Sequence, residues 1–529
     1  MVGSRYKEKQ AKTRGLSMLY NMCLIFTDGT RLCVTPIHTL GQEKMDAHIP
    51  SSDWTHLCVT PIHRLEQEKM GTHADALSRS EPVSSKQFAF LRTLFIPLII
   101  FVFLYFIQWL TRENVNNYKP IVLYPLPKKK PSPSMSCGVP VQNDPIIKVN
   151  NLNTYLVGSY IEHRQEVKMI KTIAIVLRSE TTNYNCLLCC NGQTTSVPAM
   201  YNIHSDHFGF EYGTADITCQ LPEDCETPTH VAITSRSSNK DGSSQDIHTF
   251  QPVRNQQKQE VFPYEFTVCI SVMYDYDNVL ELVQAMEMFK ILGVQKVAIY
   301  KTSCLPKTQK VLDYYIKQNF VELIPWKVNS YIKVSRGWQK SVSPGELHYY
   351  GQIPALNDCV YRYMYQTRYV ALQDLDEIIL PMNLKNWTEL LPELERKYNQ
   401  IGGFEFENNY FPLSITDSSP KYSPDSWKKV TGVNILQHII RISNDPTKFN
   451  NFKVIVNPRL VFQTTVHGFL QTVRNSVRVD PHIARMYHMR SIPREIWVTR
   501  SQIQDTHLRD YADSLIPAVS EVLRQALGI

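Results

Sequence analysis

The stretch RYVALQDLDEIILP, Arg368 to Pro381, carries three acidic residues between two apolar runs. Side chains of an extended chain alternate with a period of two, so Asp374 and Asp376 are predicted to point to the same side at the end of a buried strand. Two such carboxylates can hold Mg²⁺ or Mn²⁺, whose remaining ligands are typically substrate phosphates. The pattern favours an enzyme that acts on a nucleotide diphosphate. The alternative is a pair of solvated acids at a strand end.

The composition is that of a globular protein with room for two or three domains. The 529 residues are 43% hydrophobic and 20% charged, with a net charge of +7. Lysines and arginines are spread along the chain rather than gathered in a stripe. This distribution argues against a nucleic-acid-binding protein.

The run TLFIPLIIFVFLYFIQWL, residues 93–110, is 18 residues long and has no charge. As a helix it would rise about 27 Å, enough to cross the hydrocarbon core of a bilayer. A buried core helix would normally show a polar face, and this run has none. It therefore predicts a single transmembrane signal anchor. The basic residues on its two sides are nearly balanced, so the charges leave its orientation open.

Residues 1–92 contain a repeat, in which LCVTPIH at Leu32–His38 recurs at Leu57–His63. Two copies are too few to build the core of a solenoid, and the Cys and His spacing does not match a zinc finger. We therefore expect a largely disordered extension before the anchor. Residues 111–150 are rich in Pro, Lys and Ser, which predicts an extended stem rather than a folded unit.

Residues 151–258 are predicted to form a small β-rich domain. Short runs such as YLVGSYIEHR and IKTIAIVLR are separated by turn residues, a pattern typical of a β-sandwich. The block holds five cysteines: Cys186, Cys189, Cys190, Cys219 and Cys225. Cys186-x-x-Cys189 could bind a metal, but several cysteines in an exported domain favour disulfides. Because five is odd, at least one pairs outside the block, with Cys137 as a candidate, or stays free.

Residues 259–529 are predicted to form an α/β domain. Strand and helix patterns alternate over 261–274, 279–292, 296–302, 309–319 and 321–326, with Asp277 or Asn278 as the first helix cap and Gly293 as its stop. This order indicates parallel strands, whose ligands lie beyond the carboxyl ends of the sheet. Asp275 and Asp374 both lie at such ends.

Several motifs in this order resemble glycosyltransferase family 92. They are CISVMYDYDNVLELVQAMEMFKILGVQKVAIY from Cys269, VELIPW from Val321, the stretch from Gly345 to Pro381, and KVIVNPRLVFQTTVHGFL from Lys453. The likeness covers roughly residues 262–489, and the β-rich block is similar to the region upstream. The N-terminal repeat has no place in it.

The resemblance implies a GT-A-like catalytic domain and a type II anchor in the Golgi membrane, with the large C-terminal part lumenal and residues 1–92 cytoplasmic. It implies metal-dependent, inverting transfer of a sugar, most often galactose, from a UDP-sugar to a glycan such as the fucose of an N-glycan core. The sequon Asn386-Trp387-Thr388 is compatible with a lumenal domain. A catalytically silent, membrane-anchored lectin or scaffold is the alternative.

Under this hypothesis, Asp374 and Asp376 hold Mn²⁺ or Mg²⁺ against the diphosphate, with His467 as a third ligand, a phosphate contact or a packed core histidine. Glu377 either supports the metal pair or faces the opposite side. For the donor we expect contacts from three residues: Asp275, Asn357 and Asp358. Asp275 could equally cap the following helix. Lys333 and Arg336 could pair with phosphates or be solvated charges.

Inverting transfer also needs a base on the acceptor hydroxyl. The downstream acids that could supply it are Glu405, Glu407, Asp417, Asp425 and Asp445. Glu405 and Glu407 alternate in FEFEN and share one face of an otherwise apolar strand. The sequence does not choose among these acids, and Glu407 is preferred.

Overall fold

The computed structural model describes residues 22–25, 31–34, 135–137, 139–141, 144–235, 248–399 and 401–529. The chain forms two compact units, Met1–Ile121 and Val122–Ile529. In the first unit the described residues form an antiparallel pair, β1 (Met22–Ile25) and β2 (Arg31–Val34). The predicted anchor at 93–110, the second repeat copy and most of the predicted stem lie outside the described residues. No helix within the described ranges is long and apolar enough to span a membrane.

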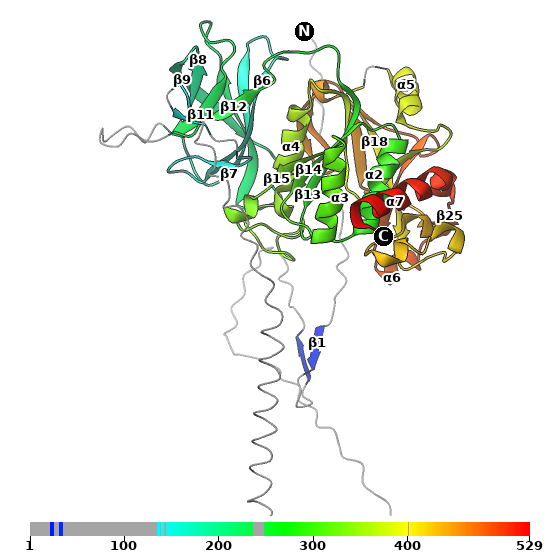
Figure 1. The fold of residues 1–529 in the computed structure, drawn as a ribbon. Helices are drawn as coiled ribbons and strands as arrows, with labels where there is room; N and C mark the ends of the chain where they lie inside the picture. The colour runs from blue at the N-terminus through cyan, green and yellow to red at the C-terminus, as the bar shows by residue number, and fades with distance from the viewer. Residues whose placement is uncertain are drawn as a thin grey trace, which may run out of the picture. The chain divides into compact units, whose positions relative to one another are not determined.

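The second unit starts with a β-rich domain (Figure 1). A short hairpin, β3 (Met135–Ser136) and β4 (Val139–Pro140), precedes a sheet with the order β12-β11-β8-β9-β10-β7-β6-β5. The strands of this sheet are β5 (Ile147–Lys148), β6 (Thr154–Glu162), β7 (Met169–Leu177), β8 (Tyr184–Cys190), β9 (Gln193–Ile203), β10 (Tyr212–Gln220), β11 (His230–Ser235) and β12 (Gln251–Arg254).

This sheet closes on itself instead of forming the two separate sheets of the expected sandwich. Strand β9 pairs with β8 through residues 193–198 and with β10 through residues 199–203, so it passes from one half of the sheet to the other. Strand β12 pairs with both β11 and β6, which completes the closure. Strands that change partners along their length turn a sandwich into a barrel-like sheet.

Disulfides hold the β-rich domain together. The bridges are Cys137–Cys189, Cys186–Cys219 and Cys190–Cys225. The predicted preference for disulfides over a metal site at Cys186-x-x-Cys189 is confirmed, because the two cysteines pair with different partners. The cysteine left over within the block pairs with Cys137, as the odd count suggested. A further bridge, Cys269–Cys359, joins two elements of the α/β domain and was not expected.

The α/β domain is built on a mixed sheet with the order β15-β14-β13-β16-β20-β18-β24-β17, with β23 beside β18. Its strands are β13 (Tyr264–Met273), β14 (Lys296–Lys301), β15 (Val321–Pro325), β16 (Thr367–Leu372), β17 (Glu377–Pro381), β18 (Gly403–Pro412), β20 (Phe452–Val456), β23 (Ser476–Arg478) and β24 (Ala484–Arg490). Two short pairs lie outside it: β19 (Ile440–Ile442) with β25 (Gln502–Gln504), and β21 (Val461–Thr465) with β22 (Gly468–Thr472).

Strand order reverses at β13, and this position determines where a ligand can bind. Strands β13, β14, β15 and β16 are parallel, with β14 on one side of β13 and β16 on the other. In an open parallel sheet, such a reversal leaves a crevice beyond the carboxyl ends of the strands. The predicted alternation of strands and helices is present, with small shifts at the ends.

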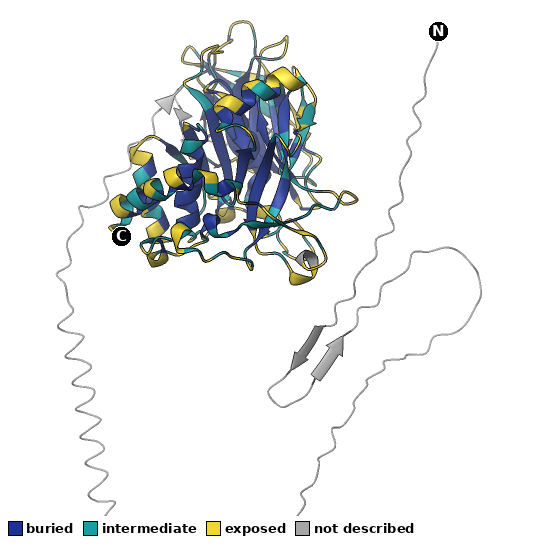
Figure 2. Cartoon of the chain, turned by 90° about the vertical axis from the view of Figure 1, so that its right-hand side faces the viewer, coloured by how far each residue is buried: buried dark blue, intermediate teal, exposed yellow. Residues whose placement is uncertain are grey.

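Helices cover both faces of this sheet (Figure 1). They are α2 (Val279–Ile291), α3 (Pro306–Lys317), α4 (Gln352–Arg362), α5 (Trp387–Tyr398), α6 (Arg494–Trp497) and α7 (Ala512–Leu527). Helices α2, α3, α5 and α7 share one apolar core with the sheet. Helix α4 packs on the other face, together with β6 and β7, and so joins the two domains. Figure 2 shows the strands as the buried interior and the exposed residues mainly on helices and loops.

Helix α2 begins and ends as its sequence predicts. Asn278 is the N-cap, and its side chain accepts a hydrogen bond from the backbone N–H of Glu281. Gly293 follows the helix with φ +96, a conformation that favours glycine. The helix therefore starts next to the carboxyl end of β13, where the crevice lies.

Candidate active site

The candidate site is a cavity of about 830 Å³ at the carboxyl ends of β13 and β16. Tyr274 and Tyr276, which follow β13, and residues 374–377, which follow β16, line it. Two histidines also line it: His467, from the turn between β21 and β22, and His488, from β24. Its place is the one that the reversal in strand order leaves open for a ligand.

Asp374 and Asp376 lie in a turn between β16 and β17 and not on an extended strand. Strand β16 ends at Leu372, so the period-two argument for a shared side does not apply to them. Both side chains nevertheless line the cavity, and they are 35% and 36% exposed. A turn, rather than strand alternation, brings the two carboxylates together.

A buried lysine lies behind the first carboxylate. Lys453 Nζ is 2.8 Å from Asp374 Oδ2 and 3.4 Å from Glu377 Oε2. Burial lowers the pKa of Lys453, but the charges of Asp374 and Glu377 outweigh burial and leave that pKa raised. Glu377 is itself buried and accepts a hydrogen bond from the Asp374 backbone N–H at 3.0 Å. Of the two roles left open for Glu377, the structure supports that of a partner behind the carboxylate pair.

A histidine lies behind the second carboxylate. His488 Nε2 is 3.1 Å from Asp376 Oδ2, and His488 Nδ1 is 3.6 Å from Glu377 Oε1. Burial lowers the pKa of His488, but its hydrogen bond to Asp376 and the charges of Glu377 and Asp376 together outweigh burial, and the net effect is a raised pKa. For Asp376, burial raises the pKa and the hydrogen bond with His488 lowers it, with a net lowering. Asp376 is therefore ionised at neutral pH, with one oxygen engaged by His488.

The second oxygen of each carboxylate is available to a ligand. Oδ1 of Asp374 and Oδ1 of Asp376 accept no hydrogen bond from another described side chain. Mg²⁺ and Mn²⁺ are held by one or two carboxylates that share the ion with phosphate oxygens, and this donor set fits such an ion. In the described part of the chain, no three His, Cys, Asp or Glu side chains are grouped to enclose a metal. The two carboxylates therefore fit a metal ion that takes its remaining ligands from a substrate. They do not fit an ion whose ligands all come from the protein.

His467 lines the same cavity, a position compatible with the ligand or phosphate contact among its predicted roles. Its Nδ1 lies 3.2 Å from the carbonyl oxygen of Phe452, which assigns the proton to Nδ1 and leaves Nε2 as the acceptor. Burial, with a smaller contribution from Lys453, lowers the pKa of His467 to about 4. The ring is therefore neutral at neutral pH and can offer Nε2 to a ligand.

Glu281 is a cavity carboxylate that the sequence did not single out. It lies in the first turn of α2 and lines the cavity, and it accepts hydrogen bonds from Tyr276 and Asn278. Burial raises the pKa of Glu281 to about 8, and the charge of Asp376 adds to this effect. Unlike Asp374, Asp376 and Glu377, it forms no ion pair with a lysine, arginine or histidine in the described structure, although the charge of His488 offsets part of the rise in its pKa.

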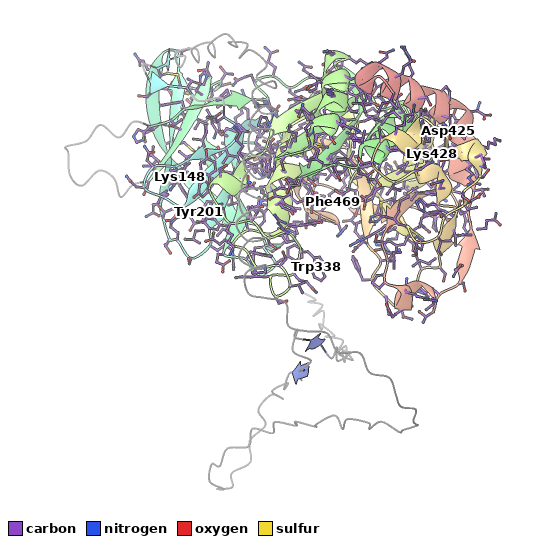
Figure 3. All side chains as sticks on the ribbon, turned by 60° about the horizontal axis from the view of Figure 1, so that its bottom comes forward. Lys148, Tyr201, Trp338, Asp425, Lys428 and Phe469 are labelled. Atoms are coloured by element: carbon purple, nitrogen blue, oxygen red, sulfur yellow. A yellow bond between two sulfur atoms is a disulfide. The ribbon has the colours of Figure 1, made fainter. Side chains whose placement is uncertain are left out.

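Aromatic side chains line the mouth of the cavity. The rings of Tyr274 and Tyr350 stack with centroids 4.3 Å apart, and the Arg336 guanidinium lies 5.5 Å from the centre of the Tyr274 ring. Trp338, labelled in Figure 3, is 59% exposed and also lines the cavity. Arg336 therefore contacts the mouth through Tyr274, whereas Lys333 does not line the cavity.

Asp275 does not line the cavity, although both of its neighbours in the sequence do. It is exposed and has a φ of +44, and its carboxylate accepts a hydrogen bond from Ser303 at 2.7 Å. It does not cap α2 either, because Asn278 does so. The structure places Asp275 at the rim of the site.

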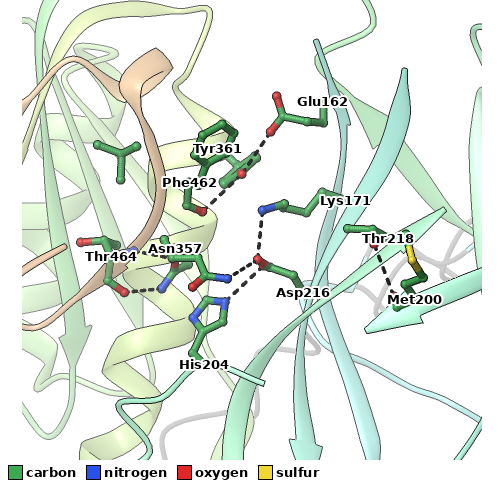
Figure 4. A network of polar contacts seen from close by, with 12 residues as sticks. Glu162, Lys171, Met200, His204, Asp216, Thr218, Asn357, Tyr361, Phe462 and Thr464 are labelled. Atoms are coloured by element: carbon green, nitrogen blue, oxygen red, sulfur yellow. Dashed lines mark hydrogen bonds and ion pairs between the residues drawn. The ribbon is translucent and has the colours of Figure 1, made fainter. Parts of the chain in front are cut away.

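Asn357 and Asp358 do not match their predicted place at the donor site, because α4 turns them towards the contact between the two domains. Asn357 exchanges hydrogen bonds with the backbone of Thr464, at 2.8 and 3.0 Å (Figure 4). Asp358 accepts hydrogen bonds from Tyr160 and from two further residues described below. Asn357 thus supports the β21 segment that leads to His467, and Asp358 bonds to the β-rich domain.

The acids proposed as the base do not line this cavity. Glu407 accepts hydrogen bonds from Asn444 Nδ2 at 2.6 Å and Asn450 Nδ2 at 3.1 Å. Glu405 accepts one from Ser476. Arg509 and Lys428 pair with Asp417 and Asp425, respectively, while Asp445 accepts from Thr447. Glu407 therefore holds neighbouring amides and does not face the candidate site.

Lys453 and His488 were missed because each meets its carboxylate across a large separation in sequence. Lys453 lies 79 residues after Asp374, and His488 lies 112 residues after Asp376. A signal exists only for Lys453, which is the one polar residue of the apolar strand FKVIV, whereas His488 lies in ARMYHMR together with two arginines. A buried charge of this kind needs a partner, but the sequence does not say which one.

Together, the sheet and the carboxylate-lined cavity at its reversal define an open α/β domain with a candidate ligand site at the carboxyl ends of its strands. Residues 264–519 match the model of glycosyltransferase family 92, and the chain carries a domain of that family. A family 92 protein of Caenorhabditis elegans is 22% identical over 231 residues, covering 44% of this chain and 43% of the relative. The beta-1,4-galactosyltransferase galt-1 of the same organism is 22% identical over 323 residues, covering 58% of this chain and 66% of the relative.

The chain thus spans less than two thirds of the length of these relatives. A solved structure, glucosyl-3-phosphoglycerate synthase from Mycobacterium tuberculosis with Mn²⁺, UDP and glucosyl-3-phosphoglycerate, is 12% identical and covers 50% of this chain and 81% of its own. Its TM-score of 0.21 is too low to carry an argument about this chain.

Proposed function

We propose that the chain is a glycosyltransferase with a GT-A-like catalytic domain that moves galactose from UDP-galactose to a glycan acceptor. One observation carries this proposal: in a family 92 domain, two carboxylates, each with one oxygen engaged, face a cavity at the reversal in strand order. The similarity to a beta-1,4-galactosyltransferase supports the choice of donor.

Asp374 and Asp376 would hold Mn²⁺ or Mg²⁺ through their Oδ1 atoms. When bound, such an ion neutralises the charge that develops on a leaving diphosphate. Lys453 and His488 fix the two carboxylates in place through their Oδ2 atoms, so that Oδ1 can face the cavity. His467 offers its neutral Nε2 to the same region.

We assign the general base to Glu281 in place of Glu407. During transfer, the bond from the anomeric carbon to the UDP oxygen breaks, a bond from the acceptor oxygen to that carbon forms, and the acceptor proton passes to the base. Glu281 lines the cavity and has neutral hydrogen-bond donors, and a base with a pKa near the working pH suits this role.

We also propose a Golgi location, with residues 93–110 as a type II anchor and the catalytic domain in the lumen. The disulfides of the β-rich domain support an oxidising compartment. Asn386 is compatible with glycosylation, because its Oδ1 caps α5 while no bond is made by its Nδ2 within the described structure.

The test is transfer by the full chain, with a panel of UDP-sugars, glycan acceptors and Mn²⁺. We expect UDP release and a new glycosidic bond with UDP-galactose, and loss of both in Asp374→Asn. Asp313→Asn, an exposed aspartate on α3, is the matched control and should keep full activity. Glycan binding without transfer from any UDP-sugar would favour the alternative of a silent lectin or scaffold.

A further inference from the structure

A second cavity, of about 320 Å³, adjoins the first. The two share three lining residues: Phe449, Asn451 and Arg490. The rest of the second cavity is lined by residues from the loop after β19 and from the segment after β24, together with Tyr410 of β18. The Tyr410 ring lies 5.5 Å from that of His488, which stands behind Asp376. A molecule in the second cavity would therefore reach the reacting end of the first.

Positive charge dominates the lining of the second cavity. It contains Lys448, Arg490 and Arg500, against a single acid, Asp445. Asp445 accepts hydrogen bonds from Thr447 and lies 3.6 Å from Lys448, so its charge is already engaged. In the described part of the chain, neither Arg490 nor Arg500 has a carboxylate partner. An arginine without a partner at a cavity wall can offer its planar fork of donors to an anion.

Amide groups lie beside these cations, and they are held in place. Glu407 accepts from the Nδ2 atoms of both Asn444 and Asn450, and the Asn408 carbonyl accepts from the same two amides. Asn444 Oδ1 is buried and has no hydrogen-bond partner. Both N–H groups of each amide are thus engaged, and the Oδ1 atoms remain to accept from sugar hydroxyls. Phe449, which is 75% exposed, offers an apolar face beside them.

The geometry points to this second cavity as the acceptor subsite, and to an acceptor glycan that carries an anionic group: a carboxylate, a sulfate or a phosphate. The proposal rests on the function proposed above, because a donor in the first cavity defines which neighbour receives the sugar. Arg500 and Arg490 bind the anion, Asn444 and Asn450 bind hydroxyls, and Phe449 packs against a sugar face. Glu407 is a positioning residue, which acts through the two amides.

The test measures saccharide binding to the full chain by calorimetry, with and without UDP and Mn²⁺. The probes are the methyl glycosides of galactose, galacturonate, galactose 6-sulfate and galactose 6-phosphate, which share a ring and differ in charge. We expect at least one anionic probe to bind about tenfold or more tightly than the neutral one, and the ranking among the three identifies the anion. Equal binding of neutral and anionic probes would overturn the proposal.

Variants separate the acceptor subsite from the donor site. Arg500→Gln should abolish the preference for the anion and leave UDP affinity within about twofold, whereas Arg494→Gln, an exposed arginine that lines neither cavity, should change neither. If Arg500→Gln weakens UDP as much as it weakens the saccharide, the arginine belongs to the donor and the proposal fails. Anion-selective binding that depends on Arg500 but comes with no transfer would preserve this subsite while rejecting the transferase function.

The positioning role of Glu407 has its own readout. Glu407→Gln keeps an oxygen that can accept from both amides, so it should keep the acceptor KM. Glu407→Ala should raise the acceptor KM about tenfold without changing the donor KM. Equal effects of the two variants, or a change confined to thermal stability, would show that Glu407 does not position the subsite.

Discussion

Asp358 and Asp376 are carboxylates beside buried cations, yet the regions that hold them differ in how fully the carboxylate is bonded. At the contact between the two domains, Asp358 is 0% exposed; its Oδ1 accepts from Tyr160, and its Oδ2 accepts from Tyr300 and Arg362. In the cavity, Asp376 is 36% exposed, and only its Oδ2 meets a partner side chain, His488. Buried polar groups that serve stability usually have all of their hydrogen bonds within the protein, whereas a binding site keeps unused hydrogen-bond acceptors for its ligand.

This difference separates stability from chemistry. Asp358 links β6, β14 and α4, and Gly158 on β6 leaves the space that it needs, because a Cβ there would collide with its Oδ1. Asp376 links nothing across the domains and faces a cavity. Substitution at the first position should therefore change folding, and substitution at the second should change activity.

The largest effect is expected at Asp376. Asp376→Asn keeps the shape of the side chain but removes its charge, and transfer should fall on the order of a thousandfold. The free energy of unfolding should change by less than about 1 kcal/mol, since the group is partly exposed. The measurements are steady-state transfer and urea denaturation of the same preparation. Wild-type activity in this variant, or full activity of the wild type in EDTA, would contradict the metal role.

The opposite result is expected at Asp358. Asp358→Ala removes the close partner of buried Arg362 and leaves it only the 3.9 Å contact with Glu322, so unfolding should become easier by about 3–5 kcal/mol. Urea denaturation, followed by tryptophan fluorescence, measures this change. Activity per folded molecule should be kept at low temperature. Asp425→Ala, at an exposed ion pair, is the control and should cost little. A stable but inactive Asp358→Ala protein would show that the residue serves the chemistry after all.

The contrast also explains what could be predicted from the sequence. The alternation of β13, α2, β14, α3 and β15 follows from local periodicity, and so does the N-cap at Asn278. The odd number of cysteines left two outcomes open, a bridge outside the block with Cys137 as a candidate or a free thiol, and the structure has the bridge. The opening motif pointed to two carboxylates that do line the cavity, but strand alternation is not what brings them together, because the chain turns after Leu372.

The remaining features depend on contacts that no local pattern contains. Asn357 and Asp358 were placed at the donor site because they precede the carboxylate strand, but the face of α4 on which they lie packs against β6 and β21. Glu407 was chosen as an acid in an apolar strand, yet two distant amides engage it. Lys453 and His488 lie on β20 and β24, which are far along the chain from the carboxylates that they contact. Tertiary packing decides all of these positions.

His348, a histidine at the cavity, should make the stability of the fold depend on pH. It lies in the cavity wall, its ring stacks on Phe208 of the β-rich domain at 4.4 Å, and its ring nitrogens are buried without hydrogen bonds. Burial, with a smaller contribution from the charge of His467, lowers the pKa of His348 to about 4. The unfolded chain therefore binds more protons than the folded one between about pH 4 and 6.5. The stability that neutral His348 provides is complete above this window and is lost as the pH falls through it.

His348→Phe should reduce this acid sensitivity. His467 acts in the same direction, so the substitution removes part of the effect, about 1–3 kcal/mol of the loss between pH 7 and pH 4. Thermal unfolding at a series of pH values gives the measurement. His482→Phe, at an exposed histidine, is the control and should leave the pH profile as it is. An unchanged profile in His348→Phe would mean that the ring is hydrated in solution.

The smallest effect on activity is expected when the N-terminal repeat, which lies outside the compact unit with the cavity, is removed. A chain that begins at Ser80 lacks both copies of the repeat but keeps the predicted anchor and the whole of Val122–Ile529. Every residue that lines the candidate site lies between Phe208 and Arg490, and the family match starts at residue 264. Two repeat copies cannot build a core of their own, so removing them should leave kcat/KM within about twofold. Transfer by the shortened and full chains, compared at equal concentrations of folded protein, measures this. A loss greater than about tenfold would show that the repeat contributes to catalysis from outside the compact unit that holds the cavity.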